Sequence, residues 1–329
     1  MKRTFAMFLA LVLSTISLAG CSQQGENVDS QAQDASSWPD QPIEVIIPYS
    51  PGGDTDFNAR AFTEYLTEEL GVPVVCSNVT GSSGTIASRQ VKDANPDGYT
   101  ALFFHTAINV NEMVGIADFG LDDFELSCIS GMSPGEIITV RSDLGVSNLD
   151  ELKAYTEEHP GELDLAIDFG TMVHINGLQM QQAGIDVNLV TAGSATERVA
   201  ALAGGHCDII INAYGTIKDY LTTGEFVALG TTGSVRASGL GDIPTCLEQG
   251  YDINLDKHYF FAFPKGTPSE IVEKFAEAIE SAEQNPEYQE SIMTAYAQDP
   301  FYASPEEGKA LMEETKEKIW EYQEQMEAS

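Results

Sequence analysis

Short apolar runs and longer amphipathic stretches alternate along the chain. The runs at 43–47, 73–76 and 100–104 are rich in valine, isoleucine and phenylalanine, as is typical of buried strands. Between the first two runs, six apolar side chains recur with helical spacing on one stripe: Phe57, Ala61, Phe62, Tyr65, Leu66 and Leu70. This succession predicts a βαβαβ unit with a parallel sheet.

The same alternation continues in a second set of elements. We expect strands at 125–130, 136–141, 163–167, 187–190, 208–211 and 227–229. Helices are expected at 148–158, 171–183 and 194–203. An apolar run at 259–264 then brings the chain back, ahead of two acidic helical stretches at 269–284 and 306–325.

The two sets together span about 290 residues, more than one hydrophobic core usually holds, so two domains are expected. We place lobe 1 at 38–125 and 260–329, and lobe 2 at 126–259. Two α/β lobes joined by crossing strands form a clamshell. Ligands of open α/β sheets lie beyond the carboxyl ends of the strands, so a cleft between the lobes is the expected binding site.

The first 20 residues have the pattern of a secretory signal peptide, with Lys2 and Arg3 ahead of an apolar run. Leu18 to Cys21 resembles the bacterial lipobox, which predicts lipidation of Cys21. An ordinary signal peptide with a coincidental cysteine is the alternative. Residues 21–37 are polar and predict a flexible tether. We therefore expect an extracytoplasmic lipoprotein, anchored at the cell surface or in the periplasm.

Acidic residues strongly outnumber basic ones. The chain has 16 Lys and Arg against 51 Asp and Glu, and loss of Lys2 and Arg3 with the signal peptide leaves 14 against 51, a difference of −37. Nucleic acid and anionic membrane surfaces are therefore poor partners. The acids are spread along helical stretches, which is typical of solvated faces and not of metal clusters.

Four cysteines follow Cys21 at positions Cys76, Cys128, Cys207 and Cys246. They form no C-x-x-C pair and no Cys-His spacing suited to zinc, so no metal site is expected. Export permits disulfides, and buried free thiols fit the apolar surroundings equally well. The sequence leaves both open.

Four turns between expected strands and helices are rich in small residues: 50–56, 78–88, 168–174 and 191–196. In the first, the strand ends at Pro48 and a Gly52-Gly53 corner leads into a helix near Thr55. Such turns leave N–H groups free to bind an anion, without a basic side chain inside any of them. The alternative is that the small residues only cap the helices.

Eight motifs give the chain a resemblance to a known family, the solute-binding proteins of tripartite tricarboxylate transporters, also called TctC or Bug proteins. The most specific is WP-D-QP-I-x-VIIP-Y-x-PGG-x-TD at 38–56. The others lie at 70–75, 78–84, 96–100, 170–174, 193–195, 204–208 and 264–268. The resemblance spans Trp38 to the C-terminus.

The resemblance implies an α/β, periplasmic-binding-protein-like clamshell of type II character that captures a small organic anion, a carboxylate or amino acid, and delivers it to membrane permease subunits. It implies no cofactor. The ligand-binding residues that the resemblance implies are Gly52, Gly53, Thr55, Gly81, Ser82, Ser83, Gly84, Thr85, Thr171, Gly193 and Ser194. We also expect Tyr49, Ser50, His105, Thr106, Asp168 and Asn212 at the ligand site.

Two departures from the family pattern bear on the ligand. A Pro-Tyr-Lys-like run is replaced by Val190-Thr191-Ala192, which removes an aromatic wall and a cationic stem. Asp168 and Phe169 stand where relatives carry small residues. If Asp168 faces the cleft, it suits a ligand ammonium and not a second carboxylate. The alternative is that Asp168 caps the helix at 171–183.

An enzyme and a sensor are the rival functions. The histidines are His105, His159, His174, His206 and His258, and no G-x-S-x-G, H-E-x-x-H or Walker motif accompanies them. His105 follows a strand toward the cleft, but a histidine held by neighbouring backbone is the commoner case, so we expect no catalysis. A sensor would use the same clamshell to report ligand to a membrane kinase, and the sequence does not separate it from a transporter receptor.

Overall fold

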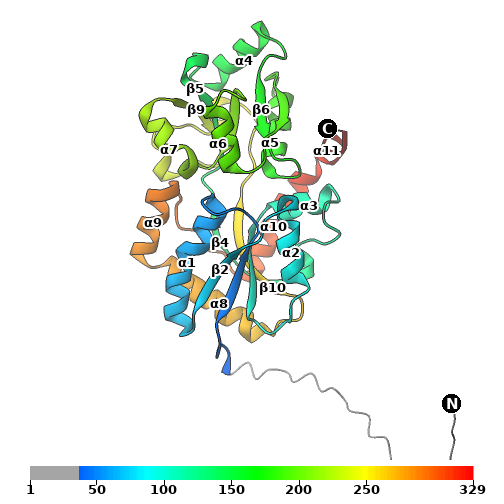
Figure 1. The fold of residues 1–329 in the computed structure, drawn as a ribbon, viewed down its shortest axis with the longest axis vertical. Helices are drawn as coiled ribbons and strands as arrows, with labels where there is room; N and C mark the ends of the chain where they lie inside the picture. Colours follow the sequence, from blue (N-terminus) through cyan, green and yellow to red (C-terminus); the bar gives the residue numbers. More distant parts are fainter. Residues whose placement is uncertain (1–36, 329) are drawn as a thin grey trace, which may run out of the picture. The chain divides into compact units, whose positions relative to one another are not determined.

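Two five-stranded mixed sheets organise the computed structural model, which describes residues 37–328 (Figure 1). The expected signal peptide, Cys21 and all but the last residue of the expected tether lie outside these residues. The described residues belong to one compact unit. We call each sheet with its helices a lobe, and the two-lobed α/β architecture expected from the sequence is confirmed.

The first sheet has the strand order β2-β1-β3-β10-β4. Its strands are β1 (Ile43–Ile47), β2 (Val74–Asn78), β3 (Thr100–His105), β4 (Phe124–Met132) and β10 (His258–Pro264). Strand β1 pairs in parallel with β2 and β3, as the predicted βαβαβ unit requires. Strand β10 enters antiparallel between β3 and β4, so a segment from late in the chain completes the first lobe.

The second sheet has the order β7-β6-β8-β5-β9. Its strands are β5 (Ile137–Arg141), β6 (Asp164–Ile167), β7 (Asn188–Thr191), β8 (Ile209–Asn212) and β9 (Phe226–Thr231). Strand β6 is parallel to β7 and β8, whereas β5 is antiparallel to β8 and β9. The carboxyl ends of β6 and β7 therefore lie at one edge of the sheet.

Helices follow most of the strands and cover the sheets. They are α1 (Asp54–Leu70), α2 (Thr85–Lys92), α3 (Ala107–Met113), α4 (Leu149–Glu158), α5 (Met172–Gln182), α6 (Ala195–Ala203), α7 (Tyr214–Thr223), α8 (Ser269–Glu283), α9 (Pro286–Tyr296), α10 (Pro305–Trp320) and α11 (Gln323–Ala328). The sequence patterns had not singled out α3, α7 and α9. Within residues 37–328, none of these helices has both the length and the apolar character that a membrane span needs.

The chain leaves the first sheet later than the sequence suggested. The expected boundary at 125–126 falls inside β4, which pairs with β10 as far as Met132. The two segments that cross between the sheets run side by side there, because the N–H of Ser133 donates to the carbonyl of Lys257 at 2.9 Å. Nearby, the His258 N–H donates to Thr106 Oγ1 at 2.9 Å, which fastens the crossing to the end of β3.

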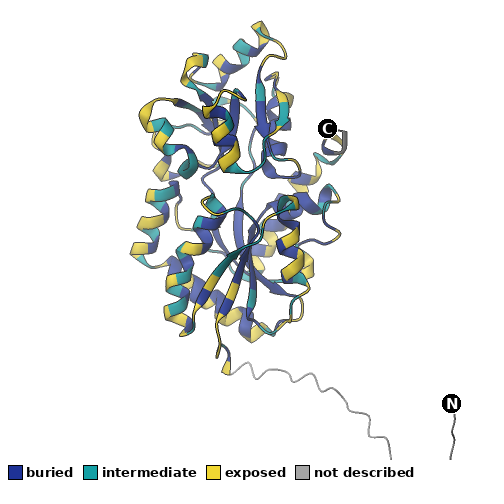
Figure 2. Cartoon of the chain, in the orientation of Figure 1, coloured by how far each residue is buried: buried dark blue, intermediate teal, exposed yellow. Residues whose placement is uncertain are grey.

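Strand β10 is an inner strand of the first sheet and is buried along its whole length (Figure 2). Its aromatic side chains pack on the apolar stripe of α1, where the rings of Phe62 and Phe261 meet edge to face with centroids 5.6 Å apart. Both side chains are fully buried. Truncation of a buried phenylalanine typically costs about 3–5 kcal/mol, so this contact accounts for the docking of α1 on the sheet.

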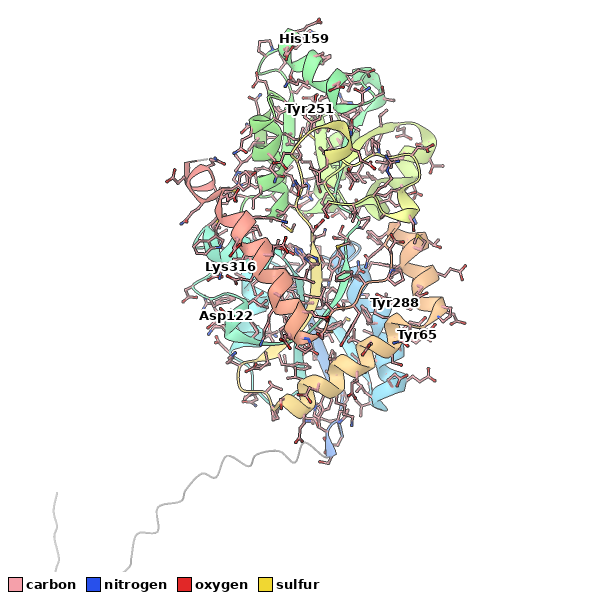
Figure 3. The ribbon with its side chains drawn as sticks, turned by 180° about the vertical axis from the view of Figure 1, so that it is seen from behind. Tyr65, Asp122, His159, Tyr251, Tyr288 and Lys316 are labelled. Atoms are coloured by element: carbon pink, nitrogen blue, oxygen red, sulfur yellow. The ribbon has the colours of Figure 1, made fainter. Side chains whose placement is uncertain are left out.

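The C-terminal helices also pack against the first lobe (Figure 3). Tyr288 of α9 packs edge-on against Tyr65 of α1, with ring centroids 6.0 Å apart. Lys316 of α10 pairs with Glu112 of α3 at 2.8 Å. Beyond them, α11 reaches α5 of the second lobe through a hydrogen bond from Gln182 to Gln325.

All four cysteines among the described residues are free thiols. Cys128, Cys207 and Cys246 are buried, and Cys76 is half-buried. Burial raises the pKa of the Cys207 thiol to about 11 and that of Cys246 to about 12. Of the two alternatives, disulfides and free thiols in apolar surroundings, the structure therefore supports the free thiols.

Candidate functional site

A cavity of about 80 Å³ lies between the lobes, at the carboxyl ends of β1, β3, β6 and β7. Both lobes line it. Half of the lining residues had been expected from the sequence: Tyr49, Ser50, Gly53, Thr55, His105, Asp168, Thr171 and Ser194. The other half had not: Asp54, Glu136, Met172, Val173, Ala195, Thr196, Arg198 and Lys257.

Three helices begin at the cavity, because the first residues of α1, α5 and α6 all line it. In each case a glycine with positive φ stands immediately before the N-cap residue: Gly52, Gly170 and Gly193. This left-handed corner turns the chain sharply from strand to helix, which few other residues tolerate. The first-turn N–H groups lack intrahelical acceptors, and they direct partial positive charge toward the cavity from both lobes.

The two glycines of the Gly52-Gly53 corner differ in backbone conformation. The φ of Gly53 is −83°, whereas Gly52 has a φ of +87°. The N–H of Gly52 donates to Asp56 Oδ2 at 3.0 Å, which holds the corner. Gly53 lines the cavity without needing the conformational freedom of glycine.

His105 presents a neutral N–H donor to the cavity. The backbone N–H of Ala107 donates to His105 Nδ1 at 3.1 Å, so the ring proton resides on Nε2. Burial and the nearby Lys257 ammonium lower the pKa of His105 to about 3. The ring stacks on Tyr49 at 5.4 Å. His105 is therefore built to donate a hydrogen bond, and its occupied Nδ1 argues against a role as general base.

Arg198 brings a cation that the sequence analysis did not anticipate at the site. Its guanidinium is bound only by neutral acceptors, with Nε donating to Asn212 Oδ1 at 2.9 Å and Nη1 to the Gly193 carbonyl at 2.7 Å. Among the described residues, no carboxylate oxygen lies within 4 Å of it. Burial lowers the pKa of Arg198 somewhat, but an arginine remains charged.

Lys257 forms a buried ion cluster with two carboxylates at the base of the crossing segments. Its ammonium contacts Asp54 Oδ2 and Glu136 Oε1, and the Tyr259 hydroxyl also donates to Asp54. Burial alone would raise the pKa of Asp54, but Lys257 and Tyr259 hold it well below its usual range. Burial raises the pKa of Glu136 despite the same ammonium. The cluster ties the start of α1 to both crossing segments.

Asp168 lies at the end of β6 and lines the cavity. The N-cap of α5 is Thr171, so the alternative interpretation of Asp168 as the cap of that helix is wrong. Thr171 instead donates to the backbone carbonyl of Asp168 at 2.7 Å. Burial raises the pKa of the Asp168 carboxyl, and the field of Arg198 partly offsets this rise.

Nine expected residues lie outside the cavity lining: Gly52, Gly81, Ser82, Ser83, Gly84, Thr85, Thr106, Gly193 and Asn212. Several of them support the site indirectly. Asn212 and the Gly193 carbonyl hold Arg198, and Thr106 fastens the crossing segment. Small size at a turn therefore marked the correct region without separating ligand-facing from supporting positions.

The turn at 78–88 joins the lobes instead of lining the cavity. Ser83 Oγ donates across the mouth to the carbonyl of Phe169 in the second lobe at 2.9 Å. A side chain at Gly170 would overlap Ile116 of the first lobe. Apolar residues of α3 and α5, including Val110 and Met172, form a shared cluster beside this contact. The lobes are thus closed on each other along this edge.

The sequence analysis found no basic residue inside the small-residue turns, but the cavity lining includes two cations from elsewhere in the chain, Arg198 and Lys257. Arg198 is the fourth residue of α6, and Lys257 directly precedes β10. Neither lies in a small-residue turn, and no local sequence pattern indicates that its side chain points toward the cavity. The only sequence signal for Arg198 was its position about one helical turn after Gly193-Ser194, and Glu197 shares that position.

Comparison with known proteins agrees with this architecture. The family described as "Tripartite tricarboxylate transporter family receptor", TctC, matches residues 58–325. A UPF0065 protein from Bordetella pertussis is 30% identical over 265 residues, covering 78% of this chain and 81% of that protein. The structure of periplasmic binding protein BugD has a TM-score of 0.79 at 25% identity, over 88% of this chain and 98% of that chain.

A further solved structure, MatC from Rhodopseudomonas palustris with bound malate, has a TM-score of 0.73 at 23% identity. It covers 88% of this chain and 99% of that chain, and it supports the fold alone. The family match extends over most of the residues that build both lobes and the cavity. The chain therefore belongs to the TctC family of tripartite tricarboxylate transporter receptors, which are extracytoplasmic solute-binding proteins.

Proposed function

We propose that this chain captures a small organic carboxylate in the cavity between its lobes and delivers it to the membrane subunits of a tripartite tricarboxylate-type transporter. One observation carries the proposal. Three helix N-termini, a neutral histidine N–H donor and an arginine without a carboxylate partner converge on the cavity between the lobes. All of these groups favour an anion.

The donor set suits a carboxylate in particular. A planar guanidinium and directed N–H groups bind its two oxygens with defined geometry, and charge-assisted hydrogen bonds of this kind contribute about 1.5–3 kcal/mol each. The small volume of about 80 Å³ provides room for roughly five to eight water-sized groups. A compact ligand is therefore favoured. The malate bound to MatC is a ligand of this chemical class in a protein of the same fold.

We assign a binding role and no catalysis to the cavity hydroxyls. Ser194 Oγ donates to Glu197 Oε2 at 2.7 Å, and the Nδ1 atom of His105 is occupied by a backbone N–H. Glu197 Oε2 also accepts the backbone N–H of Ser194 as part of the capping box of α6, and His105 Nδ1 is not free to accept a proton from a hydroxyl. A ligand incubated with purified protein is expected to return unchanged in its NMR spectrum, and recovery of a modified compound would contradict this role.

Lipidation of Cys21 would place the receptor at the outer side of the cytoplasmic membrane, next to the membrane subunits that it serves. A Cys21→Ser substitution is expected to move the protein from the membrane fraction to the soluble fraction. Retention of this variant in the membrane fraction would rule out the lipid anchor.

A thermal-shift screen over small organic acids and amino acids tests the binding function. Binding to the folded state raises the apparent stability, by about 2.7 kcal/mol at a hundredfold excess over Kd. We expect at least one compact carboxylate to raise the Tm of the wild type.

Arg198→Gln is the matching variant and should weaken binding of that carboxylate roughly 10- to 100-fold. Arg236→Gln is the control, because Arg236 pairs with Glu248 on the exposed surface of the same lobe. No shift with any carboxylate, or equal shifts in Arg198→Gln and the wild type, would contradict the proposal.

A further inference from the structure

We propose that the ligand is an amino acid or a similar zwitterion, with its carboxylate on Arg198 and its ammonium on Asp168. This inference rests on the proposed function, because it names the chemical class that the same cavity takes. Both side chains belong to the second lobe, and both line the cavity. Each carries a charge that the protein leaves without an oppositely charged partner in contact.

Asp168 is the acidic member of the pair. Its carboxylate receives no hydrogen bond and no cation within 4 Å from any of the described residues. Its backbone carbonyl, and not its side chain, holds the start of α5 through Thr171. The carboxylate is half-buried beside the cavity, a position in which the loss of water is compensated only when a donor arrives. A ligand ammonium provides three such donors.

Arg198 is the basic member. The residue is 6% exposed, and its two side-chain hydrogen bonds are to an amide oxygen and a backbone carbonyl. These contacts orient the guanidinium and leave its charge uncompensated. Arg198 and Asp168 are near enough to influence each other's pKa, yet they form no ion pair within 4 Å. The gap between them is the place for a ligand that carries both charges.

The charges of the remaining lining residues favour a zwitterion over a dianion. Lys257 is shared between Asp54 and Glu136, and this cluster carries one net negative charge when all three groups are ionised. Arg198 and Asp168 cancel, and His105 is neutral, so the lining as a whole carries one net negative charge. A zwitterion leaves that total unchanged, whereas a dicarboxylate adds two negative charges to a buried space.

The position of the acidic group also discriminates between ligands. A second ligand carboxylate next to Asp168 would face a like charge. At about 4 Å, this repulsion is of the same order of magnitude as the attraction of an opposite charge at that distance. Asp168 therefore repels the second carboxylate of a simple dicarboxylate, whereas it attracts an α-ammonium group. The expected preference of the wild type for an amino acid over its deaminated analogue is roughly tenfold or more.

Calorimetry with matched ligand pairs tests this inference. The probes are the proteinogenic L-amino acids and their deaminated acids, such as L-alanine with propionate, L-aspartate with succinate and L-glutamate with glutarate. The wild type is expected to bind one amino acid at least tenfold more tightly than its partner acid. This comparison needs no variant, so it does not depend on how a substitution affects folding.

Asp168→Asn keeps the size of the side chain and removes its charge. It is expected to weaken binding of the amino acid roughly 10- to 100-fold and to leave binding of the deaminated acid unchanged or tighter. Arg198→Gln should weaken both ligands. Circular dichroism and Tm without ligand verify that each variant folds.

The possible failures are distinguishable. If a deaminated acid binds as tightly as its amino acid and Asp168→Asn changes the affinity of neither, the zwitterion inference is wrong. The proposed carboxylate-binding function then stands, provided that Arg198→Gln still weakens binding of both ligands. If neither class of probe binds the wild type, both the inference and the proposed function are wrong.

Discussion

Lys257→Met tests the buried ion cluster that ties the crossing segments to α1. The Lys257 side chain is 7% exposed, and its partners Asp54 and Glu136 are 14% and 8% exposed. Methionine preserves most of the apolar stem of lysine and removes only the ammonium. Two buried carboxylates then face each other without a cation. Breaking a buried ion pair by removing one partner costs about 3–5 kcal/mol, so we expect a loss of that size at pH 7.5.

The pH dependence of this loss has a definite sign. In the wild type the pKa of Asp54 is held low, so its contribution to stability is present above the unfolded pKa and is lost as the pH falls. In the variant the two carboxyls remain buried without a cation, and their pKa values rise above those of the unfolded chain. The variant is then most stable in acid and loses stability as the pH rises. The difference between the two proteins should narrow from pH 7.5 to pH 4.5.

Urea unfolding followed by circular dichroism measures the difference at both pH values. A loss of 3–5 kcal/mol corresponds to a Tm decrease of roughly 5–8 °C for a chain of this size. Lys318→Met is the control, because Lys318 and Glu314 are 52% and 63% exposed and such pairs contribute about 0.3–0.5 kcal/mol. A loss below about 1 kcal/mol in Lys257→Met, or a loss that is constant with pH, would refute the assignment of a buried, charged cluster.

Three further predictions concern the crossing, the first lobe and the cleft mouth. Gly135→Ala should destabilise the fold by more than about 3 kcal/mol in urea unfolding, because its φ is +89° and a Cβ would overlap the Gly233 backbone. Gly145→Ala is the control and should cost only about 1 kcal/mol, because Gly145 has a φ of +77° but open space around it. Burial raises the pKa of Glu283 to about 8, so the contribution of this carboxyl to wild-type stability should fall as the pH rises from 5 to 8. The Glu283→Gln variant should therefore be more stable than the wild type at pH 8 but not at pH 5. The control variant Glu280→Gln, at an exposed position, should show no such change in relative stability. Ser83→Ala should weaken ligand binding roughly 2- to 10-fold in calorimetry, because it removes the hydrogen bond that joins the closed lobes; unchanged affinity would contradict a role in closure.

Much of the fold follows from local patterns. The apolar runs at 43–47 and 100–104 became β1 and β3 with little change of bounds, and α5 and α6 lie within one residue of their expected limits. These elements carry a clear period of their own. Sheet membership does not, because the run at 125–130 looks the same whichever sheet it joins. Its place in the first lobe depends on pairing with β10, more than 120 residues later in the chain.

The site was predictable only in part, for a related reason. Small residues identified the turns before α1, α5 and α6, because each sharp corner needs a glycine with positive φ. The turn at 78–88 has the same composition, yet the 3-10 turn Ser82–Gly84 directs it to the other lobe. Arg198 and Lys257 were missed because their orientation depends on how the two sheets face each other, which no local window contains.

The central claim is that a carboxylate occupies the cavity with Arg198 as its principal partner. A crystal structure of the protein with the compound that gives the largest thermal shift tests it most directly. The account predicts ligand density enclosed between the lobes, with a carboxylate oxygen at about 2.7–2.9 Å from the Arg198 guanidinium and first-turn N–H groups of α1, α5 or α6 around it. Density for the ligand outside this cavity, or inside it with the carboxylate turned away from Arg198, would contradict the account.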